Sequence, residues 1–179
     1  MNDRSPGTAW LSTDIVMEAG DWSDVGTADD LDTLVIAAAT ALADKLPPPS
    51  NGPCVAAIVF ETDAGVRALN KTYRGIDKPT NVLSFPAPPP PADIVFADDE
   101  PLPLGDVIFA LDTVRREAAD LGIPVKHHLQ HLVVHGLLHL LGHDHMTEPE
   151  AEAMERLEAD ILARLGVPDP YAESEPPPP

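Results

Sequence analysis

The sequence predicts a single α+β domain, in which a small mixed sheet of about four strands packs with about five helices. The first observation is size, because 179 residues, 44% of them hydrophobic, are enough to bury one core. The second is that short apolar runs alternate with longer stretches whose apolar residues recur at helical spacing. The third is that proline and glycine lie between these segments and mark where each predicted helix or strand ends.

The individual elements follow from these patterns. A run of β-branched residues predicts a strand, and apolar residues three and four positions apart predict a helix. Thr147 and Glu150 form a capping-box pattern that predicts the start of the last helix. The predicted order is a strand at 13–17, a helix over 31–46, a strand at 55–60, a helix around 66–70, strands at 81–85 and 105–110, and helices at 111–121, 125–141 and 147–165.

The domain is expected to span residues 12–166, with a loose start at 1–11. Residues 87–103 are rich in proline and acid and lack a useful periodicity, so we expect a loop inserted into the domain that adds nothing to the core. Residues 167–179 end in four prolines and predict a disordered tail.

Charge and composition narrow the function. A net charge of -19 argues against non-specific nucleic-acid binding. Four cations nevertheless fall within one short stretch (Arg67, Lys71, Arg74 and Lys78), so a local basic surface is expected on an acidic body. The chain has one cysteine and neither a membrane-spanning run nor a signal-peptide pattern, which predicts a cytoplasmic protein with no membrane partner.

All seven histidines lie between residues 127 and 145. His135 and His139 are four residues apart on a strongly helical stretch, so both imidazoles project from one face. Gly142 can end this helix and let His145 return as a third ligand. Three imidazoles with an open fourth position are typical of a catalytic zinc site, and we expect one zinc ion per chain.

The other histidines have simpler interpretations. His127, His128, His131 and His143 are expected to lie at the surface or to support the ligands, and His143 is the main rival ligand because it is close to His145. The spacing of the three predicted ligands matches the metzincin pattern of zinc proteases. Those enzymes carry a glutamate general base directly after the first histidine, where this chain has Gly136.

Two long segments make a family resemblance specific. HGLLHLLGHDH, residues 135–145, closely resembles the signature of the YbeY family of rRNA maturation factors, which are described as single-strand-specific metallo-endoribonucleases. LNKTYRGIDKPTNVLSFP, residues 69–86, is similar to that family's other characteristic stretch. The order of LGD at 104–106 and EAEAMERLE at 150–158 also fits, and the resemblance covers residues 55–165 well.

The resemblance implies zinc at the three histidines and a functional arginine, Arg74, whose guanidinium suits phosphate. It implies activity on single-stranded RNA, namely ribosomal RNA at the 3′ end of 16S rRNA, with the small ribosomal subunit and its proteins as partners and no DNA. Asn81 and Ser84 could line the cleft or be polar strand ends. Asp144 could orient a histidine ligand or stabilise the turn.

Three functions stay open on the sequence. The first is a zinc-dependent endoribonuclease in rRNA maturation and ribosome quality control. The second is a ribosome-assembly factor whose metal is mainly structural. The third is a metal-dependent hydrolase of another substrate such as a peptide, against which Gly136 counts. No residue is an evident general base, and both water and the 2′-hydroxyl of RNA are open as nucleophile.

Overall fold

The computed structural model describes residues 10–94, 96–97 and 99–172. Its elements are β1 (Leu11–Met17), α1 (Ala28–Lys45), β2 (Cys54–Glu61), α2 (Asp63–Arg74), β3 (Val82–Pro86), β4 (Leu102–Ala110), α3 (Leu111–Leu121), α4 (Val125–Leu140) and α5 (Glu148–Arg164). The predicted α+β fold with one small mixed sheet is confirmed.

The four strands lie in the order β1-β2-β4-β3. β1, β2 and β4 are parallel, and β3 pairs antiparallel with β4. In the register, Ile58 of β2 lies opposite Ile15 of β1 on one side and Val107 of β4 on the other. β3 is therefore the antiparallel edge of an otherwise parallel sheet.

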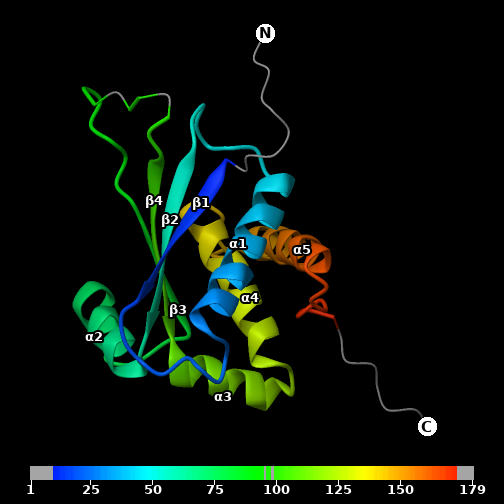
Figure 1. Cartoon of the computed structure of the whole chain (residues 1–179). Coiled ribbons are helices and arrows are strands. Elements are labelled where there is room, and N and C mark those ends of the chain that lie inside the picture. The colour runs from blue at the N-terminus through cyan, green and yellow to red at the C-terminus, as the bar shows by residue number, and fades with distance from the viewer. Residues whose placement is uncertain (1–9, 95, 98, 173–179) are drawn as a thin grey trace.

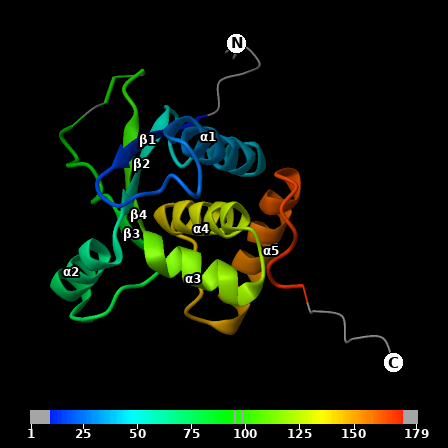
Figure 2. The ribbon, with the colours of Figure 1, turned by 60° about the horizontal axis from the view of Figure 1, so that its bottom comes forward.

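Helices cover the two faces of the sheet unequally (Figures 1 and 2). α1 and α4 pack on one face, with α5 against them on the outside and α3 beside α4. α2 lies on the opposite face, above β4. This arrangement places the end of α2 and the end of α4 on different sides of the sheet, near its β3 edge.

The main core lies between the sheet and the α1–α4 layer. β2 alternates buried and half-buried residues, as expected for a strand with one face on the main core. α4 is buried along most of its length, which explains why its sequence is apolar nearly all round. A second, smaller cluster of buried residues lies under α2: Val66, Leu83, Ile108 and Ala110.

Two strands extend into segments that the sequence predicts to be loose or a loop. β1 begins at Leu11, which is buried, and the Trp10 indole N–H donates to the Ala43 and Leu46 carbonyls (3.1 and 2.9 Å). The predicted loose start therefore does not reach residues 10 and 11. β4 begins at Leu102, inside the predicted loop, because the Leu102 N–H bonds to the Pro53 carbonyl (2.8 Å) and extends the ladder with β2.

The segment after α5 also differs from the prediction. Val167 follows the turn at Gly166 and is buried in the main core, and the Tyr171 hydroxyl donates to Glu158. Disorder predicted for 167–179 therefore does not apply to residues 167–172, and residues 173–179 lie outside the described part. Apolar Val167 and Tyr171 give this segment the anchors that the proline end lacks.

The last helix begins as its sequence predicts. The Thr147 side chain accepts from the Glu150 N–H, and the Glu150 carboxylate accepts from the Thr147 N–H, which is a complete capping box. Within the described residues no helix has the length and apolar character needed to cross a bilayer.

Candidate metal centre and cleft

His135 and His139 lie one turn apart on the same face of α4 and border a cleft that residues of β3 also line. Their Nε2 atoms are 3.0 Å apart, and their ring centroids are 4.6 Å apart. Burial lowers the pKa of His139 below its ordinary value of 6.5, and the neighbouring His135 and His145 act in the same direction. A neutral imidazole keeps the lone pair that a metal ion needs.

The chain after α4 brings the third histidine back. Gly142 has φ of 89°, which residues other than glycine rarely adopt, and this turn reverses the chain. The His145 ring then lies 5.6 Å from that of His135 and 5.1 Å from that of His139. One nitrogen from each of the three histidines lies within 4.8 Å of the others, so the group could hold one metal ion.

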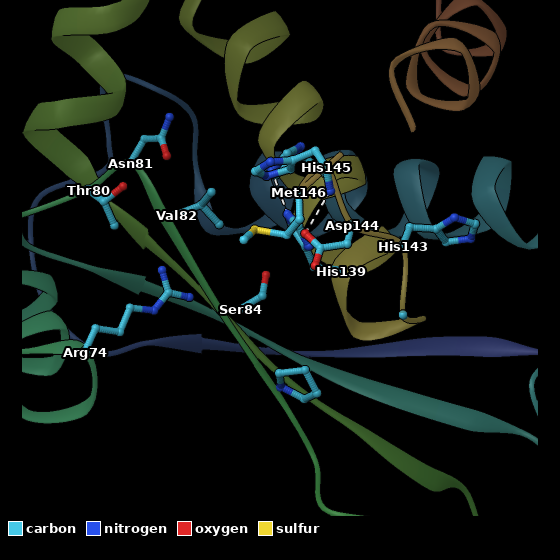
Figure 3. Close-up of a pocket in the computed structure, with 13 residues that line it drawn as sticks. Arg74, Thr80, Asn81, Val82, Ser84, His139, His143, Asp144, His145 and Met146 are labelled. Carbon is cyan, nitrogen blue, oxygen red and sulfur yellow. Dashed lines mark hydrogen bonds between the residues drawn. The ribbon is translucent and has the colours of Figure 1, made fainter. Parts of the chain in front are cut away.

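Two neighbours of His145 take different roles. The Asp144 carboxylate accepts from the His145 backbone N–H (2.7 Å), so of the two interpretations of Asp144 the geometry favours the turn. His143 lines the cleft, but its ring points away from the other histidines (Figure 3). The group of donors close enough to share an ion does not include it.

Gly136, between the two helical histidines, marks the closest approach of α4 to the sheet. A Cβ atom at this position would lie 2.4 Å from Val107 Cγ1, a distance that real side chains do not allow. The Ser84 hydroxyl donates to the Gly136 carbonyl (3.2 Å) and holds β3 to the helix. Gly136 stands where metzincin proteases carry the general base, and Val107 of β4 fills the space that a side chain would need there.

Arg74 approaches the histidines from the other side of the cleft. It is the last residue of α2, and its exposed guanidinium extends toward the cleft that the histidines border (Figure 3). The cleft has a volume of about 560 Å³. Among the described residues Arg74 forms no salt bridge. The lining comprises Arg74, Thr80, Asn81, Val82, Ser84, Pro86, His135, His139, Gly142, His143, Asp144, His145 and Met146.

The predicted basic surface is partly neutralised. Arg67 Nε and Lys71 Nζ both contact the Asp77 carboxylate (2.8 and 3.3 Å). Hydrogen bonds from Arg67 and then Lys71 hold the pKa of Asp77 below its ordinary value, so this carboxylate is charged at neutral pH. Two of the four cations therefore share an anion, and Arg74 is the one that lines the cleft.

Sequence reasoning missed one residue next to the metal ligands, Glu158 of α5. Its carboxylate is fully buried and lies 2.5 Å from His135 Nδ1 and 2.9 Å from His131 Nε2. A signal was present in the sequence, because Glu158 falls on the apolar stripe that includes Met154 and Ile161. A carboxylate on such a stripe needs a buried partner.

The remaining histidines also differ from one another. His128 is buried, and its Nε2 lies 2.8 Å from Glu117 Oε2, which accepts from the amide of Asn81 (2.9 Å). His131 is bound to Glu158, and His127 is half-buried without a place in either donor group. Asn81 and Ser84 both line the cleft, as one of their two interpretations expected.

Together the fold and the site define a class of protein. It is a small α+β domain with a cleft that joins an arginine to three histidines placed as metal ligands, without the acid of the zinc peptidases. The chain belongs to the endoribonuclease YbeY family, whose model matches residues 21–166.

Individual relatives agree with the family. The chain is 50% identical to an endoribonuclease YbeY from Rhodopseudomonas palustris (strain BisA53) over 164 residues, covering 92% of each chain. It is 48% identical to that of Bradyrhizobium sp. (strain BTAi1), covering 92% of this chain and 94% of the relative. The solution structure of TM1509 from Thermotoga maritima has the same fold, with a TM-score of 0.53 and 20% identity, covering 94% of this chain and 100% of that one.

Proposed function

We propose that this protein is a zinc-dependent endoribonuclease that cuts single-stranded RNA during rRNA maturation, at the 3′ end of 16S rRNA, and in ribosome quality control. The observation that carries the proposal is that Arg74 and the three histidines line one cleft. The name of the relatives, endoribonuclease, supports RNA as the substrate. The small ribosomal subunit is the proposed partner and the cytoplasm the proposed location.

The donor set fits zinc. Three imidazole nitrogens that lie within 4.8 Å of one another match the ligand type and number of catalytic zinc sites. His135, His139 and His145 would hold the ion, and the exposure of His145 leaves a path to it from the cleft. When bound, zinc supplies Lewis-acid activation at its open position.

Arg74 supplies the complementary part of the site. Its guanidinium can donate two parallel hydrogen bonds to a phosphate and stabilise the charge that builds on the phosphate oxygens during cleavage. Because Arg74 and the histidines enter from α2 and from the end of α4, a phosphate bound between them would be contacted from two sides. Val82 and Ser84 of β3 form the wall between these two groups.

One observation favours the second candidate, a ribosome-assembly factor whose metal is mainly structural. Among the residues that line the cleft, Asp144 is the one carboxylate, and it already accepts from a backbone N–H. Among the residues that line the cleft, a carboxylate general base could therefore come from Asp144 alone, and Asp144 also stabilises the turn. The peptidase candidate is disfavoured more strongly, because the base would have to replace Gly136, where a Cβ atom would lie 2.4 Å from Val107 Cγ1.

The decisive experiment is cleavage of a defined single-stranded RNA by zinc-loaded and metal-free protein, with identification of the product ends. Zinc-dependent cleavage that requires both His139 and Arg74 would support the nuclease. A 2′,3′-cyclic phosphate with a 5′-hydroxyl would assign the RNA 2′-hydroxyl as nucleophile, and a 3′-hydroxyl with a 5′-phosphate would assign water. RNA left intact by pure zinc protein would leave the assembly factor as the function.

The ligand assignment has its own test. Elemental analysis should find about one zinc per chain, as in other sites with three histidine ligands. Alanine at His135, His139 or His145 should each abolish tight binding, whereas His127→Ala and His128→Ala should retain it. Zinc retained by His139→Ala would show that the site is misassigned.

A further inference from the structure

We propose that Glu158 is a positioning residue that fixes the His135 imidazole with its proton on Nδ1, and that His131 and Tyr171 hold Glu158 in place. The inference rests on the proposed metal site, because its purpose is to keep His135 Nε2 free for the ion. It adds α5 and the segment after it to the support of that site.

The geometry around the carboxylate is the first support. Glu158 Oε1 lies 2.5 Å from His135 Nδ1, on the opposite side of the ring from the Nε2 atom that faces His139. The other oxygen, Oε2, lies 2.9 Å from His131 Nε2 and accepts from the Tyr171 hydroxyl. An ionised carboxylate only accepts hydrogen bonds, so all three partners must be donors.

Burial is the second support. Glu158 has 0% exposure, and a charge so placed is tolerated when hydrogen bonds replace the lost water. Hydrogen bonds from His131, His135 and Tyr171 surround the buried carboxylate. A carboxylate that accepts from His135 requires a proton on Nδ1, which leaves the lone pair of Nε2 free for a metal ion.

The network joins three parts of the chain. His131 and His135 are one turn apart on α4, and their rings are nearly perpendicular with centroids 6.3 Å apart. Glu158 comes from α5. Tyr171 comes from the segment after α5, and its ring lies 5.5 Å from that of His131. The C-terminal segment thus contacts a residue that orients a metal ligand.

A second metal ion is the competing explanation, because His131, His135 and Glu158 also form a group that could hold one. The hydrogen-bond reading is favoured by distance. The 2.5 Å between Glu158 Oε1 and His135 Nδ1 is the length of a hydrogen bond, and it is shorter than the 3.0 Å between the two Nε2 atoms of the proposed metal site. The Tyr171 hydroxyl also donates to this carboxylate, which is a hydrogen-bond contact and not a metal contact.

The tautomer can be measured without metal or RNA. In ¹⁵N-labelled, metal-free, full-length protein, long-range ¹H–¹⁵N correlation spectra at pH 8 should show His135 as the Nδ1–H form. In Glu158→Leu, which removes the acceptor, the Nε2–H form should appear. The Nε2–H form in the unmodified protein would overturn the proposal.

Zinc affinity is the second readout, measured by competition with a chelating dye. Loss of an acceptor behind a metal-bound histidine typically costs about 10- to 100-fold in affinity, which we expect for Glu158→Leu. Glu158→Gln keeps one acceptor oxygen and should lose less. Ile161→Ala is the matched control, because it removes buried volume from the same face of α5 but no hydrogen-bonding group, and it should bind zinc as the unmodified protein does.

Tyr171→Phe keeps the proposal testable if Glu158→Leu does not fold. It removes one hydroxyl from the partly exposed end of the network, so the protein should fold, keep the Nδ1–H form and bind zinc less than tenfold more weakly. Unchanged zinc affinity in both Glu158→Gln and Tyr171→Phe would overturn the positioning role. A second zinc per chain that Glu158→Gln loses and His139→Ala keeps would make Glu158 a ligand instead.

The experiments distinguish a failure of the role proposed for Glu158 from a failure of the proposed nuclease function. If His139→Ala abolishes zinc binding while the Glu158 variants behave as the unmodified protein, the metal site stands and the support by Glu158 falls. If zinc and the tautomer behave as expected but RNA is not cut, the nuclease proposal falls and Glu158 keeps its role.

Discussion

Arg74 is the residue whose role the geometry makes most specific. Arg74→Ala should leave folding and zinc content unchanged and lower RNA cleavage by an order of magnitude or more, the scale on which losing one charge-stabilising donor is felt. Arg74→Lys should restore little, because an ammonium group cannot make paired hydrogen bonds to a phosphate. Initial rates on a labelled single-stranded RNA provide the measurement.

The control for Arg74 is its neighbour on the same helix. Arg67→Ala removes an equal charge from α2, but Arg67 is paired with Asp77 and does not line the cleft. Its cleavage rate should stay within a few-fold of the unmodified protein. Equal losses in the two variants would mean that general attraction, rather than a contact in the cleft, explains the effect.

For individual residues, the sequence could predict those features of the site that depend on neighbours along the chain. The helical spacing of His135 and His139, and a glycine that turns the chain before His145, are local features, and the structure does bring these rings together. Spacing places Glu158 on the apolar stripe of α5, but it could not identify the histidines that Glu158 contacts, because they lie on another helix. Which groups a buried acid contacts is decided by packing.

Among the elements, α4 depends on the absence of a side chain at Gly136. Gly136→Ala should place a Cβ atom against Val107 and force the helix from the sheet, at a cost of about 1 to 3 kcal/mol in the free energy of unfolding. Urea unfolding of the metal-free protein measures it. Val107→Ala in the same chain makes room, so the double variant should lose less than the two single losses added together.

An unfolding free energy for Gly136→Ala at or above that of the unmodified protein would contradict the close approach. Alanine favours helices more than glycine by about 1 kcal/mol, so without the clash the substitution would stabilise α4. The sign of the change therefore distinguishes the two cases. The sequence could indicate that a peptidase base is missing here, but the reason for a glycine needed the position of β4.

Asp77 sets the net charge near the end of α2, because it pairs with Arg67 and Lys71. Its lowered pKa keeps Asp77 ionised at all pH values above its ordinary 3.8, where it offsets one charge of Arg67 and Lys71. Asp77→Asn should therefore tighten binding of single-stranded RNA several-fold at low salt, measured by fluorescence anisotropy. Between pH 5 and 8 this carboxylate should contribute no pH dependence.

Asp160→Asn is the matched control for Asp77→Asn. Asp160 also pairs with a lysine, Lys45, but it lies on α5, which Figure 2 shows on the far side of the molecule from α2. RNA affinity should change little in this variant. Equal tightening by both substitutions would show that RNA responds to the overall charge and not to the end of α2.

The whole molecule has a net charge of -19, so attraction of RNA must be local. If three or four phosphates are contacted, the logarithm of affinity should fall with the logarithm of salt with a slope of about −2 to −3. Charge reversal in Lys71→Glu or Lys78→Glu should weaken binding, whereas Lys126→Glu, at the start of α4, should matter less. An RNA affinity that changed neither with salt nor with these substitutions would contradict the nuclease proposal.

At the same scale, the fold class could be predicted and the order of the strands could not. Periodicity reports which segments are strands, but the order β1-β2-β4-β3 depends on pairing between residues far apart, such as Leu11 with Cys54. The same limit explains Leu102, whose place in β4 depends on β2 and is hidden by a proline-rich neighbourhood. The meeting of Arg74 with the histidines is a consequence of this topology.

The position of β3 at the edge of the sheet has a consequence for solubility. Exposed strand edges invite pairing with another chain, and natural proteins limit this with short strands and proline. β3 spans five residues, ends at Pro86, which has no N–H to offer, and leads into a segment rich in further prolines. The cleft can therefore stay open along a sheet edge without making that edge a template for aggregation.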